Sequence, residues 1–169
     1  TATYVYNFTD TTDNFARKCS YNSISPVAIN FTGCYWQYYS SSQIGNLNNT
    51  DGNRNSWLCM NSRCHLQYNF TIDQPINSIT NLSVRFVGYD NYGMMGDGKL
   101  SFHIWNWTSF SWKEIANSVG GSSDKNFTGS FTSANDFINA TTKVLWLSVV
   151  GGNDLACFLP DTKILMADK

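Results

Sequence analysis

Short runs in which apolar and polar residues alternate recur along this chain, and they limit its possible folds more than any other feature. In residues 99–107 (KLSFHIWNW), one face carries Leu100, Phe102 and Ile104, and the other carries Ser, His and Trp. A period of two is typical of a β-strand that places one face in a core. The same alternation occurs in residues 65–72, 79–89 and 143–150, and shorter runs occupy residues 3–8, 111–115 and 126–131.

Loop-forming segments rich in Gly, Asn, Asp and Ser separate these runs. The clearest are residues 48–55 (NNTDGNRN), 89–98 (YDNYGMMGDG) and 118–124 (SVGGSSD). A chain of 169 residues can bury one complete core and is too short to need two. The pattern therefore predicts an all-β fold, a two-sheet antiparallel sandwich with jelly-roll or Greek-key connections.

The charge of the chain argues against several partners. Its formal net charge is -1 and charged residues make up 14% of it. It therefore lacks the positive electrostatic potential that attracts nucleic acids and anionic lipids. No apolar run approaches the roughly 20 residues that cross a bilayer, and no signal sequence precedes Thr1, so any export signal is expected to have been removed. We expect neither a nucleic-acid partner nor a transmembrane segment.

The cysteines indicate a compartment. There are five, at Cys19, Cys34, Cys59, Cys64 and Cys157. The local pairing of Cys59 with Cys64 and of Cys19 with Cys34 is preferred, although four cysteines allow three pairings. A zinc site that combines thiols with His65 and His103 is the less favoured alternative. Disulfides predict an oxidising location, outside the cell or on its surface.

Asn-X-Ser/Thr sequons are frequent and agree with that location. The eight sequons are at Asn7, Asn30, Asn48, Asn69, Asn81, Asn106, Asn126 and Asn139. They predict glycosylation of several asparagines in a secreted chain. Strand alternation alone also generates such triplets, because Asn and Thr face water while the residue between them faces the core.

Residues 76–152 resemble a known kind of module. The segments NSITNLSVRFVGYD, GKLSFHIWNWTSFSWKEI and NDFINATTKVLWLSVVGG are similar to those of jelly-roll modules in secreted microbial and archaeal surface proteins and in carbohydrate-binding appendages. The resemblance implies a jelly-roll fold, and it supports this fold more than it supports any particular activity.

The last residues resemble a different family. CFLPDTKILMAD, residues 157–168, is similar to the first block of inteins and related Hint autoprocessing domains, with matches at Cys157, Pro160, Thr162, Ile164, Leu165, Ala167 and Asp168. The resemblance implies that Cys157 attacks the carbonyl carbon of Ala156 and forms a thioester. The family's acid/base histidine and oxyanion hole come from later blocks. Lys169 replaces the family's usual glycine.

Two other interpretations of this tail stay open. It can be a final strand with an unpaired thiol, or its LPDT can be the core of a sortase sorting signal, although Lys163 follows it and no membrane span does. We expect a β-sandwich over residues 1–156 and the start of a Hint-like segment over 157–169. Because the alternation ends near Val150, the sandwich is expected to fold without the tail.

Two weaker binding sites can be suggested. Asp51, Asn53 and Asn55 could begin a loop that holds a structural calcium ion, with an ordinary polar hairpin loop as the alternative. Trp105, Trp107 and Trp112, with Phe110 and Tyr92, could form a platform on which sugar rings stack, with core packing as the alternative.

Catalysis has little support in the sequence. Glu114 is the only glutamate and the aspartates lie in predicted loops, so no paired carboxylates flank a glycosidase-like motif, and no nucleophile elbow is present. The chain is expected to be a non-enzymatic extracellular module with a structural or adhesive role, self-assembling, whose precursor is cleaved or spliced at Ala156/Cys157. The alternative is a carbohydrate-binding module of a secreted enzyme. The expected partners are copies of itself or cell-surface glycans.

Overall fold

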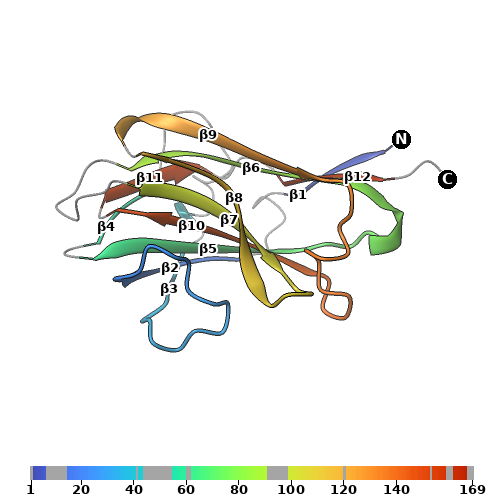
Figure 1. The fold of residues 1–169 in the computed structure, drawn as a ribbon, viewed down its shortest axis with the longest axis horizontal. Coiled ribbons are helices and arrows are strands. Elements are labelled where there is room, and N and C mark those ends of the chain that lie inside the picture. The colour runs from blue at the N-terminus through green and yellow to red at the C-terminus, as the bar shows by residue number, and fades with distance from the viewer. Residues whose placement is uncertain are drawn as a thin grey trace.

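Two antiparallel sheets face each other in this protein, as the ribbon in Figure 1 shows. The computed structural model describes residues 2–6, 15–40, 42–43, 55–59, 62–90, 99–119, 121–152, 154–158 and 162–166. The arrangement confirms the predicted two-sheet antiparallel sandwich of jelly-roll or Greek-key type. Within these residues, no helix is long and apolar enough to span a bilayer.

Sheet B contains the strongest alternating runs. Its order is β3 (Gln37–Tyr38), β2 (Phe15–Tyr21), β5 (Arg63–Thr71), β10 (Val144–Gly151), β7 (Lys99–Asn106) and β8 (Ser111–Val119). Neighbours in this sheet are mostly distant in the sequence, so the chain crosses between the sheets repeatedly. Strand β2 was not predicted, because Arg17 and Lys18 interrupt its apolar residues.

Sheet A is built around one long strand, β6 (Ile79–Asp90), which follows the short 3-10 turn η1 (Ile76–Ser78). Strand β9 (Gly121–Phe131) pairs along one edge of β6. The other edge is shared by β12 (Thr162–Met166), which pairs with residues 79–84, and β11 (Asp154–Phe158), which pairs with residues 87–90. Strands β1 (Thr3–Tyr6) and β4 (Asn55–Leu58) extend the sheet beyond β12 and β11.

The tail therefore differs from the expectation that the strands end near Val150. Residues 154–158 and 162–166 are strands of sheet A, and the expected division between residues 156 and 157 falls inside β11. Ala156 pairs with Tyr89 and Ser56, and Cys157 pairs with Gly88 and Asn55. The alternation hid these strands because Gly151 and Gly152 interrupt the pattern before β11.

The core lies between the sheets and confirms the predicted faces. Leu100, Phe102 and Ile104 of β7 are fully buried, together with residues of β5 and β10 from the same sheet. From sheet A, Phe86 packs on Phe102 at a centroid distance of 5.7 Å. Burial of these large apolar side chains is the main stabilising term of such a sandwich.

Both preferred disulfides are present, Cys19–Cys34 with a Cα–Cα distance of 6.0 Å and Cys59–Cys64 with 5.5 Å. Both fall in the range of ordinary disulfides. The bond between Cys59 and Cys64 joins the segment after β4 to β5. The two bonds and the sandwich fold fit an extracellular module.

Candidate functional site

The face of sheet B that points away from the core carries a straight row of polar residues. Cross-strand pairing aligns Arg17, Gln67, Ser148, His103 and Glu114 on β2, β5, β10, β7 and β8. Alternation predicts that this face meets water. All members of the row except Glu114 are buried instead, so another part of the molecule covers the face.

Residues 22–36, which we call the covering loop, provide much of that cover. The loop follows β2 and lies against the outer side of sheet B, at the bottom of Figure 1. The carbonyl oxygen of Val27 accepts hydrogen bonds from Gln67 Nε2 and from Trp112 Nε1, each at 2.8 Å. The carbonyl of Ile29 accepts one from Arg17 Nη2 at 2.5 Å. The loop backbone thus satisfies buried donors of the sheet.

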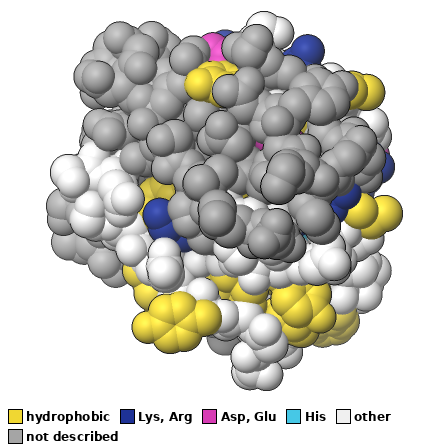
Figure 2. Space-filling view, turned by 90° about the vertical axis from the view of Figure 1, so that its left-hand side faces the viewer, with side chains coloured by type: hydrophobic (Ala, Val, Ile, Leu, Met, Phe, Trp, Pro, Cys, Tyr) yellow, Lys and Arg dark blue, Asp and Glu magenta, His cyan; other side chains and the backbone are white. Residues whose placement is uncertain are grey.

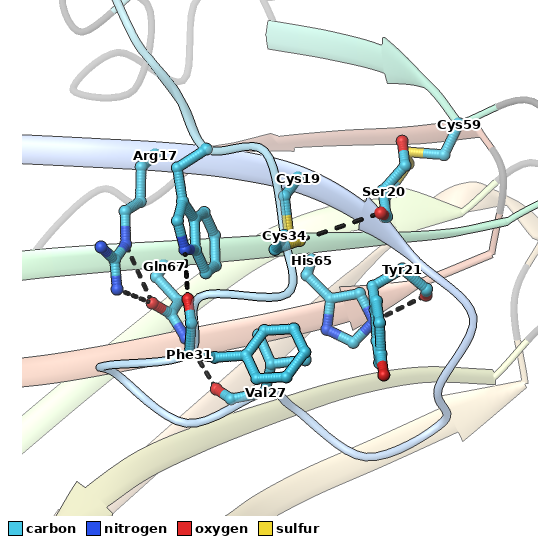
Figure 3. Close-up of a disulfide and its surroundings, with 12 residues drawn as sticks. Arg17, Cys19, Ser20, Tyr21, Val27, Phe31, Cys34, Cys59, His65 and Gln67 are labelled. Atoms are coloured by element: carbon cyan, nitrogen blue, oxygen red, sulfur yellow. Dashed lines mark hydrogen bonds between the residues drawn. A yellow bond between two sulfur atoms is a disulfide. The ribbon is translucent and has the colours of Figure 1, made fainter.

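Local contacts keep the covering loop compact, as Figure 3 shows around its disulfide. Cys34 ties the end of the loop back to Cys19 on β2. Trp36 Nε1 donates to the carbonyl of Phe31 at 3.1 Å. Gly33 lies under the Phe31 ring, where an added Cβ would be 2.5 Å from Cζ, so a side chain at this position would displace the ring.

Arg17 is the centre of the covered part of the face. Its Nε and Nη2 both donate to Gln67 Oε1, at 3.0 and 2.6 Å. Its guanidinium lies 4.1 Å from the ring centroid of Trp36 and 4.9 Å from that of Trp146, within cation–π range. Burial lowers the pKa of Arg17, and Tyr38 partly opposes the shift, but an arginine keeps its charge in a protein.

Aromatic residues form a second row beside the polar one. Phe15 meets Trp146 edge-on at a centroid distance of 5.2 Å, and Trp105 meets Trp112 edge-on at 5.1 Å. The T-shaped geometry is the favourable one for aromatic pairs. Trp105 is only 5% exposed, and its Nε1 is buried without a hydrogen-bond partner among the described residues.

An open hollow of about 390 Å³ lies where the covering loop meets the β7–β8 hairpin. Its lining residues are Ser25, Pro26, Ala28, His103, Trp105, Phe110, Ser111, Trp112 and Glu114. It thus combines aromatic rings with a carboxylate and a buried indole N–H. Such a mixture of apolar walls and a few polar groups is typical of small-molecule sites.

The turn between β7 and β8 presents Phe110 to the hollow. Asn106 Oδ1 accepts hydrogen bonds from the backbone N–H groups of Thr108 and Ser109, each at 2.8 Å, and so shapes the turn. Phe110 has a φ of 50° and its side chain is 72% exposed. A left-handed conformation is costly for a non-glycine residue, and such strain concentrates at functional sites.

His103 is neutral at physiological pH. Burial lowers its pKa to about 4 and outweighs the opposing effect of Glu114, whose Oε2 is 3.6 Å from His103 Nε2. Lys99 Nζ is 4.0 Å from the same carboxylate oxygen. Glu114 is exposed, so its carboxylate is accessible from solvent.

Three comparisons with known proteins bear on this site. Neither a protein-family model nor the sequence of a curated protein matches the chain. Among solved structures, the xylan-binding module CBM15 matches with a TM-score of 0.51 at 12% identity, over 99% of this chain and 98% of that one. The likeness is one of fold. A second carbohydrate-binding module, TmCBM27, described for specific mannan recognition, matches with a TM-score of 0.33 at 12% identity, over 62% of this chain and 66% of that one.

The structure brings together part of the predicted tryptophan platform. Trp105, Trp112 and Phe110 line the hollow, whereas Trp107 does not. The indole N–H of Trp107 donates to the carbonyl of Val144 and its backbone N–H to that of Asp136, so Trp107 anchors the turn to a neighbouring loop. Tyr92 lies outside the described residues.

Several residues of this face were missed by the sequence analysis. Gln67 occupies a polar position that alternation assigns to solvent, Arg17 lies on the unpredicted strand β2, and His103 was considered only as a zinc ligand. The rings of Trp36 and Trp146 pack on the Arg17 guanidinium. The signal that could have found them is a cysteine, Cys19, on the same face of β2 as Arg17. A disulfide on an outward face means that another segment lies over that face.

The predicted calcium loop cannot be placed. Asp51 and Asn53 lie outside the described residues, and Asn55 is described only as the first residue of β4. Within the described part of the chain, no three His, Cys, Asp or Glu side chains are grouped to hold a metal ion. The calcium site stays a prediction.

The sequon asparagines differ in accessibility. Asn30 and Asn126 are exposed, Asn81, Asn106 and Asn139 are half-buried, and Asn69 is 5% exposed on the covered face of sheet B. Asn7 and Asn48 lie outside the described residues. Glycosylation stays a prediction, and Asn69 is the described sequon with least room for a glycan in the folded chain.

Proposed function

We propose that this chain is a carbohydrate-binding module whose ligand occupies the hollow beside the β7–β8 hairpin. The observation that carries the proposal is the exposed Phe110, held in a strained conformation next to Trp112, Trp105 and a carboxylate. Aromatic faces stack on the apolar faces of sugar rings, while carboxylates and indole N–H groups bind ring hydroxyls. The fold shared with a xylan-binding module agrees with this proposal.

Binding without hydrolysis fits the lining of the hollow best. Among the described residues that line it, Glu114 is the single carboxylate, and glycosidases canonically place two carboxylates on either side of the scissile bond. Neutral His103 is buried behind Glu114 and adds a polar group without a charge.

A glycan array followed by calorimetric titration tests the proposal. In the variant Phe110→Gly, affinity for the selected sugar should fall roughly five- to thirtyfold, the equivalent of about 1–2 kcal/mol of stacking and burial. The melting temperature should stay unchanged or rise, because glycine adopts a positive φ without strain. Tyr4→Ala is the control, since Tyr4 is a part-exposed aromatic residue on sheet A.

A loss of affinity equal to that of Tyr4→Ala would remove Phe110 from the site. If the wild-type chain binds no glycan, the proposal fails as a whole. The interpretation as a structural or adhesive module that associates with its own copies would then take its place, and sedimentation would measure that association.

We also propose, from the sequence resemblance, autoprocessing at Ala156/Cys157. In a chain continued by the later blocks of a Hint domain, hydroxylamine or a small thiol should release a fragment that ends at Ala156, and Cys157→Ala should abolish the release. Because this peptide bond lies in β11 between β4 and β6, cleavage requires a precursor in which the bond is outside the sheet. An intact precursor under these conditions would return Cys157 to an ordinary unpaired cysteine.

A further inference from the structure

We propose that the hollow binds the end of a saccharide chain and excludes interior segments of long polysaccharides, an inference that rests on the proposed function. The covering loop supports it, because the loop crosses the path that an extended ligand would need.

The polar row marks this path across sheet B. Glu114 and His103, on β8 and β7, line the hollow. Gln67 lies on β5, two strands from β7, and Arg17 lies on β2, three strands from β7. Both side chains donate hydrogen bonds to carbonyl oxygens of the covering loop. Because neighbouring strands lie about 4.8 Å apart, the covered part begins within roughly 10 Å of β7. A chain that entered over β8 would meet the loop after a short distance.

Several contacts hold this barrier in place. The Val27 carbonyl oxygen accepts hydrogen bonds from Gln67 on β5 and from Trp112 on β8, so one atom of the loop is bound to side chains of two strands that are not neighbours. Moving the loop away would leave the N–H groups of Gln67 and Trp112 without this acceptor, which is costly for buried groups, and Arg17 would lose its bond to the Ile29 carbonyl. The Cys19–Cys34 disulfide also keeps the loop from leaving the face. The loop is therefore part of the resting structure of the site.

The hollow lies at an edge of sheet B. Strand β8 is the edge strand of sheet B, and both Glu114 on β8 and Phe110 just before it are exposed. A volume of about 390 Å³ is near the lower limit of small-molecule pockets, which hold about 300–1,000 Å³. The hollow thus suits a terminal ring with its neighbour, which enters from the β8 edge.

The chemistry of a chain end suits the lining. A terminal ring carries a free hydroxyl where an interior ring carries the next glycosidic bond. Trp112, which lines the hollow, is hydrogen-bonded to the Val27 carbonyl of the covering loop, so we expect a further ring in this direction to meet the loop. The exposed Glu114 carboxylate can accept hydrogen bonds from ring hydroxyls.

Calorimetric titration with oligosaccharides of increasing length tests the inference. The probes are xylo- and manno-oligosaccharides of one to six rings. A third series of the same lengths is built from the sugar that gives the strongest signal on the glycan array. Affinity should stop rising at two rings, and methylation of one chain end should lower it at least tenfold. An affinity that increases with every added ring and is unchanged by the methyl group would overturn the inference, while the proposed function would stand. If no saccharide binds at all, the proposed function is rejected, and the inference with it.

A pair of disulfide variants tests the role of the loop. Cys19→Ser/Cys34→Ser frees the covering loop and should let longer oligosaccharides bind at least threefold more tightly than two-ring ones. Cys59→Ser/Cys64→Ser is the matched control, because it removes a disulfide outside the loop and should keep the wild-type length profile. A length profile unchanged in the folded loop variant would contradict the barrier. If that variant does not fold, the wild-type series and its end-blocked probes still decide.

Discussion

At the scale of single residues, Arg17 shows how the covered face of sheet B is held together. Its guanidinium bonds to Gln67 and to the Ile29 carbonyl, and it lies against the rings of Trp36 and Trp146. No other side chain of the polar row connects as many elements. Among the described residues the donors of this buried arginine meet oxygen acceptors and its plane meets aromatic faces, and these contacts offset the cost of its burial.

The variant Arg17→Met should lower the free energy of unfolding by about 1–3 kcal/mol, because methionine keeps much of the length but leaves two acceptors unsatisfied. Arg85→Met is the matched control. Arg85 bonds to Asn126 on the exposed side of sheet A, and its loss should change stability by about 0.5 kcal/mol or less. Denaturant unfolding measures both. Equal effects of the two substitutions would show that the Arg17 network contributes little.

At the scale of elements, β11 and β12 complete sheet A. Together they pair with most of one edge of β6, and β4 and β1 pair with their outer sides. Without them, a central strand of the sheet would become an edge with unpaired N–H and C=O groups.

Truncation after Gly152 should therefore lower the melting temperature by roughly 10 °C or more, since several kcal/mol of pairing and burial are lost. Removal of Ala167–Lys169, which follow β12, is the control and should have little effect. Thermal denaturation followed by circular dichroism gives the comparison. Equal melting temperatures for the truncated and full chains would show that the sandwich is complete at residue 152, as the alternation alone predicts.

At the scale of the whole molecule, the two faces of sheet B have different partners. One face packs on sheet A to make the core, and the other lies under the covering loop. Apolar surface is not confined to the interior, because Tyr35, Tyr38 and Ile24 are exposed in or beside the covering loop. Figure 2 shows hydrophobic side chains along the lower part of one end of the molecule, on the side where Figure 1 places this loop.

Because the outer face is covered, the stability of the whole molecule should depend on pH. Burial lowers the pKa of both His65 and His103 to about 4, from 6.5. Above pH 6.5 both histidines are neutral in the folded and in the unfolded chain, so they cause no loss in the free energy of unfolding. As pH falls from 6.5 towards 4, the unfolded chain binds protons that the folded chain does not, and stability is lost, by up to about 3 kcal/mol for each histidine.

Unfolding at pH 5 should accordingly take up nearly one proton for each histidine. The pH dependence of the unfolding free energy measures this uptake, and His103→Gln should reduce it by about half. An uptake near pH 5 that is the same in His103→Gln and wild type would show that His103 is accessible to protons in the folded chain.

The sequence by itself determined the fold class and the core faces, and it favoured the local disulfides that the structure contains. Alternation of the kind seen in Leu100, Phe102 and Ile104 depends only on the geometry of a strand, in which successive side chains point to opposite faces. Cysteines as close in the sequence as Cys59 and Cys64 can meet across a short loop whatever the rest of the fold is. Three of the aromatic residues that line the hollow, Trp105, Phe110 and Trp112, could also be suggested, because aromatic residues are dense in this short segment.

The tertiary structure alone decided which face becomes a site. Alternation assigns Gln67 and His103 to a solvent face and does not predict the strand of Arg17, and apart from Cys19 nothing local indicates that residues 22–36 lie over them. Cross-strand rows are equally invisible, since Arg17 and Glu114 align only through the pairing of strands far apart in the sequence. The same holds for the tail, because its role in sheet A depends on which edge of β6 is free to pair. Burial and register are properties of the assembled chain, so a pattern that depends on one strand at a time cannot contain them.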